Sequence, residues 1–292
     1  MKVLVTGSNG QLGREIRKIA NKCFNEYVFT SKTILNDTDT IYLDITDIEL
    51  IRRVVKNNNI DVIVNCAAYT NVEKAETDVE TCELLNVKGA ENLAIVAKEY
   101  DCLLVHISTD YVFDGRTKCT PYIETDECNP ISVYGRTKLE GEKKIQEIGC
   151  RYIILRTSWL YTKKGNSFVN KILTLAKTKD EIKVVFDQVG SPTNALEFAI
   201  IIDIIINKYK PEFDGIYHYS DEGVCSWYDF ASMIIQYSNI VNVRVLPCHS
   251  NEFKSNVNRP SYSVLDKTKI KDTFGITKIH WTESLKLMLY SN

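Results

Sequence analysis

Two residues that could transfer a proton lie four positions apart in this chain. Tyr134 and Lys138 flank the stretch Gly-Arg-Thr, so a helix would place both side chains on one face. A free phenol has a pKa near 10 and is a poor acid at neutral pH. An ammonium about 6 Å away, at an effective dielectric constant of about 20, favours the phenolate by roughly 3 kcal/mol. The spacing therefore predicts a tyrosine whose pKa is lowered toward the range of general acid catalysis.

A polar run precedes this expected helix. The apolar segment 102–108 is typical of a buried strand, and Thr109, Asp110 and Tyr111 follow directly after it. Ligands of open α/β sheets bind at the carboxyl ends of the strands. We therefore expect the Thr109 hydroxyl to help hold the substrate oxygen that Tyr134 protonates.

Three glycines follow the first apolar segment. Gly7, Gly10 and Gly13 have the spacing GxxGxxG, after an expected strand at 2–6 and before an expected helix at 11–22. Such a loop makes a tight turn and lets the backbone approach a pyrophosphate at a helix N-terminus. We interpret it as a dinucleotide-binding loop; the alternative is an ordinary glycine-rich turn.

The end of the second expected strand bears on cofactor choice. An acidic residue there usually takes the ribose hydroxyls of NAD, but this chain has Thr30, Ser31 and Lys32. A lysine and two hydroxyls permit NADPH without excluding NADH.

The rest of the first half alternates buried strands with amphipathic helices, a pattern typical of a parallel sheet covered on both faces. We expect an α/β doubly wound, Rossmann-like fold. A dinucleotide-binding domain would span residues 1–156, and 157–292 would form mainly a smaller α/β substrate-binding part, with about 183–220 returning to the sheet. The strands are expected at 2–6, 27–30, 40–43, 61–66, 102–108, 152–156, 183–186 and 215–219, and the helices at 11–22, 48–57, 78–99, 130–148, 168–177, 194–209 and 226–237.

Composition narrows the function further. A net charge of −2, from 36 basic and 38 acidic residues, gives no field that favours nucleic acid or an anionic membrane. The apolar stretch 198–206 is interrupted by Asp203 and is too short to span a bilayer. The nine cysteines have no CxxC spacing and the four histidines are scattered, so we predict free thiols, no zinc site and a cytoplasmic protein.

Several longer motifs accompany these residues. They are TGxxGxxG (6–13), NCAAYT (65–70), STDYVFDG (108–115), PxxxYGRTKLEGE (130–142), RTSWLY (156–161), DQVGSPT (187–193) and Arg259-Pro260. This set resembles the extended short-chain dehydrogenase/reductases and, within them, the dTDP-4-dehydrorhamnose reductase family, over nearly the whole chain. The resemblance implies NAD(P)H-dependent reduction of the 4-keto group of dTDP-4-dehydro-L-rhamnose to dTDP-L-rhamnose.

The resemblance also implies residue roles. Tyr134 would protonate the 4-keto oxygen, Thr109 would bond the same oxygen, and Lys138 would lower the pKa of Tyr134 and bind the nicotinamide ribose. Asp110, Tyr111 and Trp159 would line the sugar-nucleotide pocket, and Arg259 would hold the diphosphate. Besides Tyr134 and Lys138, the implied cofactor positions are Gly7, Asn9, Gly10, Gln11, Leu12, Gly13, Ser31, Asp44, Ile45, Ala67, Ala68 and Tyr69.

Two departures from the family pattern matter. Ser31 stands where many members have an acidic residue, which leaves the choice between NADH and NADPH open. Some members form a homodimer through Mg²⁺ held by glutamates. Glu15 and Glu197 match two of those positions and a third ligand is not assigned, so an ordinary solvated carboxylate is the alternative for both.

Other functions share parts of this pattern. Sugar-nucleotide dehydratases resemble STDEVYG, with a glutamate as base, where this chain has Tyr111. An epimerase would retain its NAD through the cycle. A non-catalytic dinucleotide-binding regulatory subunit has no need for an acid, a lysine and a hydroxyl together, and this chain has all three. We therefore favour a reductase that acts on a small-molecule sugar nucleotide.

Overall fold

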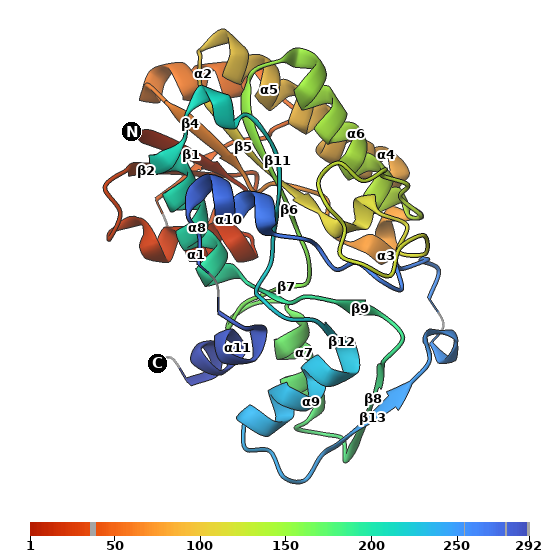
Figure 1. Cartoon of the computed structure of the whole chain (residues 1–292). Coiled ribbons are helices and arrows are strands. Elements are labelled where there is room, and N and C mark those ends of the chain that lie inside the picture. The colour runs from red at the N-terminus through yellow and green to blue at the C-terminus, as the bar shows by residue number, and fades with distance from the viewer. Residues whose placement is uncertain (36–38, 254, 278, 291–292) are drawn as a thin grey trace.

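The computed structural model describes residues 1–35, 39–253, 255–277 and 279–290. Figure 1 shows two parts. The larger part is one sheet with helices on both faces, and the smaller part lies at the carboxyl edge of that sheet. Among the described residues, no helix has the length and apolar composition needed to cross a bilayer.

One parallel sheet organises the larger part. Its seven strands run in the order β3-β2-β1-β4-β5-β6-β11, and every neighbouring pair is parallel. This order confirms the predicted doubly wound, Rossmann-like fold. The strands are β1 (Lys2–Thr6), β2 (Glu26–Ser31), β3 (Thr40–Tyr42), β4 (Val62–Asn65), β5 (Leu103–Thr109), β6 (Arg151–Thr157) and β11 (Gly215–Tyr219).

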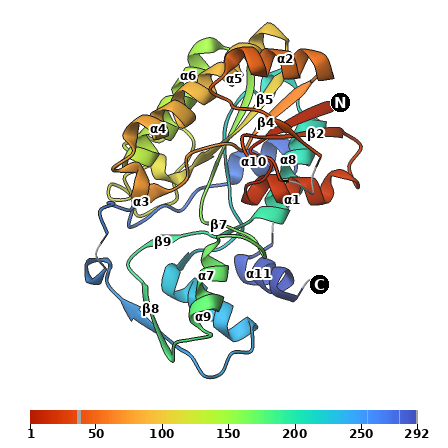
Figure 2. The same ribbon diagram turned by 180° about the vertical axis from the view of Figure 1, so that it is seen from behind.

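Helices cover both faces of this sheet, as Figures 1 and 2 show from opposite sides. Each face buries its own apolar core, so both faces of the strands are hydrophobic and side-chain alternation is absent from the sequence. One face carries α1 (Gln11–Ala20), α8 (Ala195–Lys208) and α10 (Thr268–Phe274). The other carries α2 (Ile48–Asn58), α5 (Gly89–Glu99) and α6 (Val133–Ile148), with the short α3 (Val72–Ala75) near their carboxyl-edge end.

The expected helix at 78–99 is interrupted. It consists of α4 (Val79–Glu83), a π-helical turn η1 (Leu84–Lys88) and α5. The wide turn carries the buried Asn86, whose side-chain oxygen accepts the backbone N–H of Tyr69 at 2.8 Å and whose amide donates to Thr137 Oγ1 at 3.0 Å. The interruption thus ties the loop after β4 to helix α6, which is a tertiary demand that helical periodicity does not reveal.

Helix α6 starts later than the expected Pro130 because Ser132 caps it, accepting the backbone N–H of Gly135 at 3.1 Å. Gly135 lets the first turn approach the 3₁₀ turn η2 (Asp110–Val112): a Cβ there would lie 2.1 Å from the Tyr111 carbonyl oxygen. Gly141 makes the same kind of close approach to Asn86. These contacts set the position of the helix that bears Tyr134 and Lys138.

The smaller part has its own core of aromatic and aliphatic side chains. Residues 195–219 return to the large sheet as α8 and β11, whereas β8 pairs with β13 inside the smaller part. The elements of this part are β7 (Leu160–Tyr161), α7 (Phe168–Leu175), β8 (Glu181–Val185), β9 (Val189–Gly190), β10 (Thr193–Asn194), β12 (Cys225–Ser226), α9 (Trp227–Tyr237), β13 (Arg244–Cys248) and α11 (Trp281–Tyr290), with the 3₁₀ turn η4 (Ser250–Glu252). The 3₁₀ turn η3 (Pro211–Phe213) connects α8 to β11 in the larger part.

A buried ion pair fixes α6 against the sheet and supplies a stability prediction. Glu142 accepts from Arg156 Nη2 at 2.7 Å and also from Ser108, and both members of the ion pair are almost fully buried. Glu142→Gln should lower the free energy of unfolding by about 3–5 kcal/mol, because it leaves the Arg156 charge buried without a partner. Urea denaturation measures this. Glu147→Gln, which breaks an exposed pair with Lys144, is the control and should leave the midpoint unchanged. Equal midpoints for both variants would contradict the assignment.

Candidate active site

The glycine loop is shaped by two close backbone approaches. Gly7 has φ 61°, and a Cβ on it would lie 2.7 Å from the backbone of Ala67. A Cβ on Gly13 would lie 2.5 Å from the backbone of Ser8. Gly10, the exposed residue before α1, would meet only the Gly7 carbonyl, at 3.1 Å. Gly7 and Gly13 are therefore required by the fold, whereas Gly10 leaves the helix N-terminus accessible from outside.

Three other loop positions interact with the protein itself. Asn9 donates to the Thr33 carbonyl at 2.6 Å, and Gln11 donates to the Asn166 carbonyl at 2.8 Å. The Leu12 side chain is buried in the core beneath the sheet. Leu12 can therefore offer a ligand only its backbone, while Gln11 links the loop to residues of the smaller part.

A carboxylate does lie at the end of β2, but it belongs to Asp44, which follows β3 in the chain. Asp44 forms an ion pair with Lys32 at 2.6 Å and accepts from Thr46, while the neighbouring Ile45 side chain is buried. Burial by itself would raise the pKa of Asp44, but the hydrogen bonds from Lys32 and Thr46 lower it. Lys32 is thus paired with a carboxylate, which sequence reasoning about this strand end did not anticipate.

Ala67, Ala68 and Tyr69 follow β4 at the carboxyl edge of the sheet. Asn86 holds the backbone of Tyr69, and the Tyr69 hydroxyl donates to Asp78 Oδ2 at 3.0 Å. Because Gly7 packs directly on Ala67, this segment and the glycine loop form adjoining walls at one edge of the sheet.

Tyr134 lies beside the polar run that ends β5. Its ring is partly exposed and contacts the ring of Tyr111 edge-on, with centroids 5.6 Å apart. Burial raises the pKa of Tyr134 above its ordinary value, and a hydrogen bond with the Thr109 hydroxyl opposes this. The expected lowering by Lys138 is not what the structure shows, because the lysine amine makes its bonds elsewhere and desolvation dominates. Tyr134 therefore keeps its proton at neutral pH, and in the absence of ligands burial makes it a weaker acid than a free phenol.

Lys138 is 2% exposed and lies between α6 and β5. Its Nζ donates to the carbonyl of Ile107 at 2.7 Å and is 3.0 Å from Nε2 of His106. Burial lowers the pKa of Lys138 to about 8, against a raising effect of Glu142 one turn along the helix.

Asp110 and Thr109 complete the polar edge. Thr109 Oγ1 donates to Asp110 Oδ1 at 3.1 Å, and the carboxylate is 2% exposed. Burial raises the pKa of Asp110 to about 6, while hydrogen bonds, including one from Ser263, oppose this. The structure thus brings Thr109, Asp110, Tyr111 and Tyr134 together.

Trp159 stands at the junction of the two parts, directly after β6. It has φ 46°, a strained conformation for a bulky side chain, and its ring stacks on Trp227 with centroids 3.7 Å apart. Gly190 makes room for it, since a Cβ there would lie 2.7 Å from the indole. The surrounding packing therefore determines where this ring lies.

Arg259 is held by a carboxylate of the larger part. Its guanidinium donates to Glu73 at 2.6 Å and to Ser255 Oγ at 2.8 Å. The hydrogen bonds that Glu73 accepts from Arg259 and from the Ser255 hydroxyl lower its pKa. An anionic ligand would compete with Glu73 for the same guanidinium.

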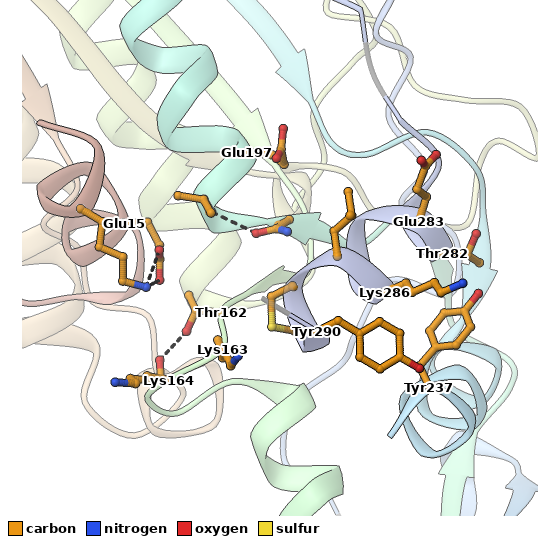
Figure 3. Close-up of a pocket in the computed structure, with 15 residues that line it drawn as sticks. Glu15, Thr162, Lys163, Lys164, Glu197, Tyr237, Thr282, Glu283, Lys286 and Tyr290 are labelled. Carbon is orange, nitrogen blue, oxygen red and sulfur yellow. Dashed lines mark hydrogen bonds and ion pairs between the residues drawn. The ribbon is translucent and has the colours of Figure 1, made fainter. Parts of the chain in front are cut away.

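A separate pocket of about 1060 Å³ lies between α1, α8 and α11, and it is lined by Glu15 and Glu197 (Figure 3). Glu15 is ion-paired with Lys18 at 2.7 Å, and Glu197 projects from α8 on the other side of the pocket. The described residues contain no group of three or more His, Cys, Asp or Glu side chains placed to bind a metal ion.

Sequence reasoning did not single out His106, Asn65, Asn86 or Glu73. His106 precedes Ser108 by two residues on β5, so both side chains point to the same face of the sheet. That face meets residues 138 and 142 of α6, four apart. This alternation could have identified His106, whereas the Glu73–Arg259 pair spans 186 positions and leaves no local signal.

Comparison with known proteins shows the family to which this chain belongs. Residues 1–292 match the family model described as RmlD substrate binding domain. A dTDP-4-dehydrorhamnose reductase of Aggregatibacter actinomycetemcomitans is 37% identical over 98% of this chain and 97% of the relative. A solved dTDP-4-dehydrorhamnose reductase of Clostridium acetobutylicum is 41% identical with a TM-score of 0.90, over 99% of this chain and 98% of that one.

Another solved dTDP-4-dehydrorhamnose reductase, from Bacillus anthracis and in complex with NADP, is 35% identical with a TM-score of 0.86. The match covers 98% of this chain and 98% of that one. Matches of this identity and coverage are far beyond a shared fold alone. The chain therefore belongs to the RmlD substrate binding domain family.

Proposed function

We propose that this protein reduces the 4-keto group of dTDP-4-dehydro-L-rhamnose to dTDP-L-rhamnose with NADPH or NADH. The observation that carries the proposal is that Tyr134 lies beside Thr109 and Tyr111, on the helix that holds the buried Lys138, at the carboxyl edge of a sheet that also bears the glycine loop. The names of the relatives and the NADP in the Bacillus anthracis structure support it.

The dinucleotide would lie along the carboxyl edge of the sheet. Its pyrophosphate would bind at the α1 N-terminus beside Gly10, its adenosine ribose near Ser31 and Asp44, and its other ribose beside Ala67 and Lys138. When bound, the reduced nicotinamide supplies the hydride.

In the proposed reaction Tyr134 donates its phenolic proton to the keto oxygen as that oxygen gains negative charge. The Thr109 hydroxyl turns its single proton from Asp110 Oδ1 to the same oxygen, and this hydrogen bond stabilises the developing alkoxide. A Lys138 ammonium stabilises the phenolate that remains on Tyr134. Tyr111 and Trp159 would line the sugar-nucleotide pocket with Asp110, and Arg259 would bind the diphosphate in place of Glu73.

The competing functions make different demands. A dehydratase needs a base that removes a proton from carbon, and the position that would supply it carries the phenol of Tyr111, whose pKa burial raises to about 12. A non-catalytic dinucleotide-binding subunit gives no reason for Thr109, Tyr134 and a buried Lys138 to converge. A reductase uses all three groups.

The direct test mixes the purified protein with dTDP-4-keto-L-rhamnose and each reduced cofactor, and follows the nicotinamide absorbance. Stoichiometric loss of the reduced cofactor with formation of dTDP-L-rhamnose is expected. Bound NAD that survives purification, with no net consumption of NADPH or NADH, would favour an epimerase instead.

We further propose that the protein works in the cytoplasm as a homodimer. The pocket of Figure 3 belongs to a face on which Leu287 and Tyr290 of α11 are exposed by 56% and 53%. A second copy of the chain would cover these apolar side chains.

The role of Tyr134 as proton donor can be tested by removing its hydroxyl group. Tyr134→Phe should lower kcat by about 10²–10⁴, as expected for loss of a general acid. Cofactor affinity measured by calorimetry should stay close to wild type, because only a hydroxyl is lost. Tyr209→Phe is the control: its hydroxyl bonds Asp214, away from the site, and kcat should not change. Wild-type turnover in Tyr134→Phe would overturn the assignment.

Cofactor choice can be tested at Ser31. An aspartate there can still accept the Thr33 N–H that Ser31 Oγ accepts at 3.2 Å, so the fold is retained. At about 5 Å and an effective dielectric constant of about 20 it repels a 2′-phosphate by a few kcal/mol, which screening reduces. Ser31→Asp should raise the KM for NADPH about tenfold, with the KM for NADH equal or lower. Ser31→Asn is the neutral control. Equal effects on both cofactors would show that residue 31 does not face the ribose.

The diphosphate contact can be tested from both sides of the Arg259–Glu73 pair. Arg259→Ala should raise the KM for the sugar nucleotide about 10- to 100-fold, the value of a charge-assisted hydrogen bond. Affinity for the cofactor should not change. Glu73→Gln removes the competing carboxylate and should leave this KM equal or lower. Steady-state titration of the sugar nucleotide decides, and an unchanged KM in Arg259→Ala would exclude the contact.

A further inference from the structure

A chain of buried polar side chains connects β1 to Lys138. Thr6, Asn65, His106 and Lys138 lie on β1, β4, β5 and α6, and each is at most 2% exposed. Thr6 Oγ1 is 2.6 Å from Asn65 Oδ1, Asn65 Nδ2 is 3.0 Å from His106 Nδ1, and His106 Nε2 is 3.0 Å from Lys138 Nζ. The proposed reaction uses Lys138 and leaves the role of the other three open.

The hydrogen-bond pattern assigns the tautomer of His106. The backbone N–H of Ala67 donates to Asn65 Oδ1 at 3.2 Å, so this oxygen faces Ala67 and the amide nitrogen faces His106. An amide nitrogen can only donate, and His106 Nδ1 must therefore accept. The proton of the neutral imidazole consequently lies on Nε2, the atom that faces Lys138.

This tautomer presents an N–H to the lysine nitrogen. An ammonium has three protons and no lone pair, so it cannot accept that bond, whereas a neutral amine can. The carbonyl of Ile107, 2.7 Å from Nζ, accepts a proton from either form. His106 does not take up a second proton, because burial holds the pKa of the imidazole well below its usual range. The neutral imidazole with its proton on Nε2 is therefore the form that faces Lys138.

The charges around Lys138 do not remove this preference. Besides His106 on β5, the titratable groups that act on its amine are Glu142 on its own helix, Cys82 on α4 and Cys66 after β4. All three raise the lysine pKa, yet desolvation outweighs them and the pKa falls to about 8. An N–H aimed at Nζ acts in the same direction as desolvation.

We propose that His106 is a positioning residue for the proposed reductase reaction, holding Lys138 Nζ between its own Nε2–H and the Ile107 carbonyl and favouring the neutral amine. The inference rests on the proposed function for its catalytic meaning, but its effect on Lys138 is a property of the free protein. The lysine then gains or loses its proton close to the working pH.

The direction in which activity changes with pH follows from the protonation of Lys138. The ammonium form of Lys138 is present below its pKa, and activity that needs it declines as the pH rises through about 8. A glutamine at position 106 places its amide near the Nε2 position and can rotate to aim its oxygen at the lysine. That oxygen accepts from an ammonium, so His106→Gln should raise the lysine pKa and move the alkaline limb upward.

Two measurements test this. The Lys138 resonance of the free protein, labelled with ¹³C at lysine Cε and assigned by its loss in Lys138→Met, should titrate about one pH unit higher in His106→Gln than in wild type. Single-turnover cofactor oxidation should show the same upward shift of its alkaline limb. At neutral pH the rate of His106→Gln should stay within about threefold of wild type. His106→Asn, too short to reach Nζ, should lose about 10–100-fold in rate with little change in KM.

His218→Asn is the matched control, since His218 is also fully buried, lies on β11, and its Nδ1 is 3.0 Å from the backbone carbonyl oxygen of Tyr122. It should shift neither the resonance nor the limb, even where it lowers stability. Identical titration of Lys138 in wild type and His106→Gln would overturn the inference. A shifted resonance in a protein that does not reduce the sugar nucleotide would instead overturn the proposed function and leave the inference standing.

Discussion

The structure depends on a lysine amine buried between a helix and a strand. Lys138 is 2% exposed, and water does not solvate its amine. Burying such a group is costly unless hydrogen bonds replace the lost solvent. Ile107 and His106 on β5 provide those partners, so the position of α6 on the sheet, and with it the position of Tyr134, is set by this requirement.

Helix α6 packs on β5 because the side-chain spacing of the helix coincides with that of the strand. Side chains two apart on a strand share a face, and side chains four apart on a helix share a face. His106 meets Lys138, and two residues later Ser108 meets Glu142, four residues after the lysine. Gly135 and Gly141 remove the side chains that would prevent this close packing. Arg156 on β6 then closes the polar row by pairing with Glu142.

The sequence was sufficient to predict the order and type of most elements of the sheet, because a parallel sheet covered on both faces leaves consecutive apolar residues such as Val62, Ile63 and Val64. It was also sufficient to predict that Thr109, Tyr111 and Tyr134 lie at the carboxyl edge of the sheet, since the ends of parallel strands meet there. It failed where a feature depends on contacts distant in sequence. The π-helical turn at Asn86, the Lys32–Asp44 pair and the Glu73–Arg259 pair are examples. The pKa of Tyr134 was also misjudged, because desolvation cannot be read from an i,i+4 spacing.

In the proposed reaction, hydride reaches the sugar carbon while Tyr134 protonates the oxygen bonded to it. The most direct measurement uses cofactor carrying deuterium at the transferable position of the nicotinamide, with dTDP-4-keto-L-rhamnose in ordinary water, and locates the label by NMR. One deuterium at C4 of the sugar for each cofactor oxidised is the predicted result. Oxidation of the cofactor with no deuterium at C4, or deuterium at another carbon of the sugar, would contradict the proposed reaction.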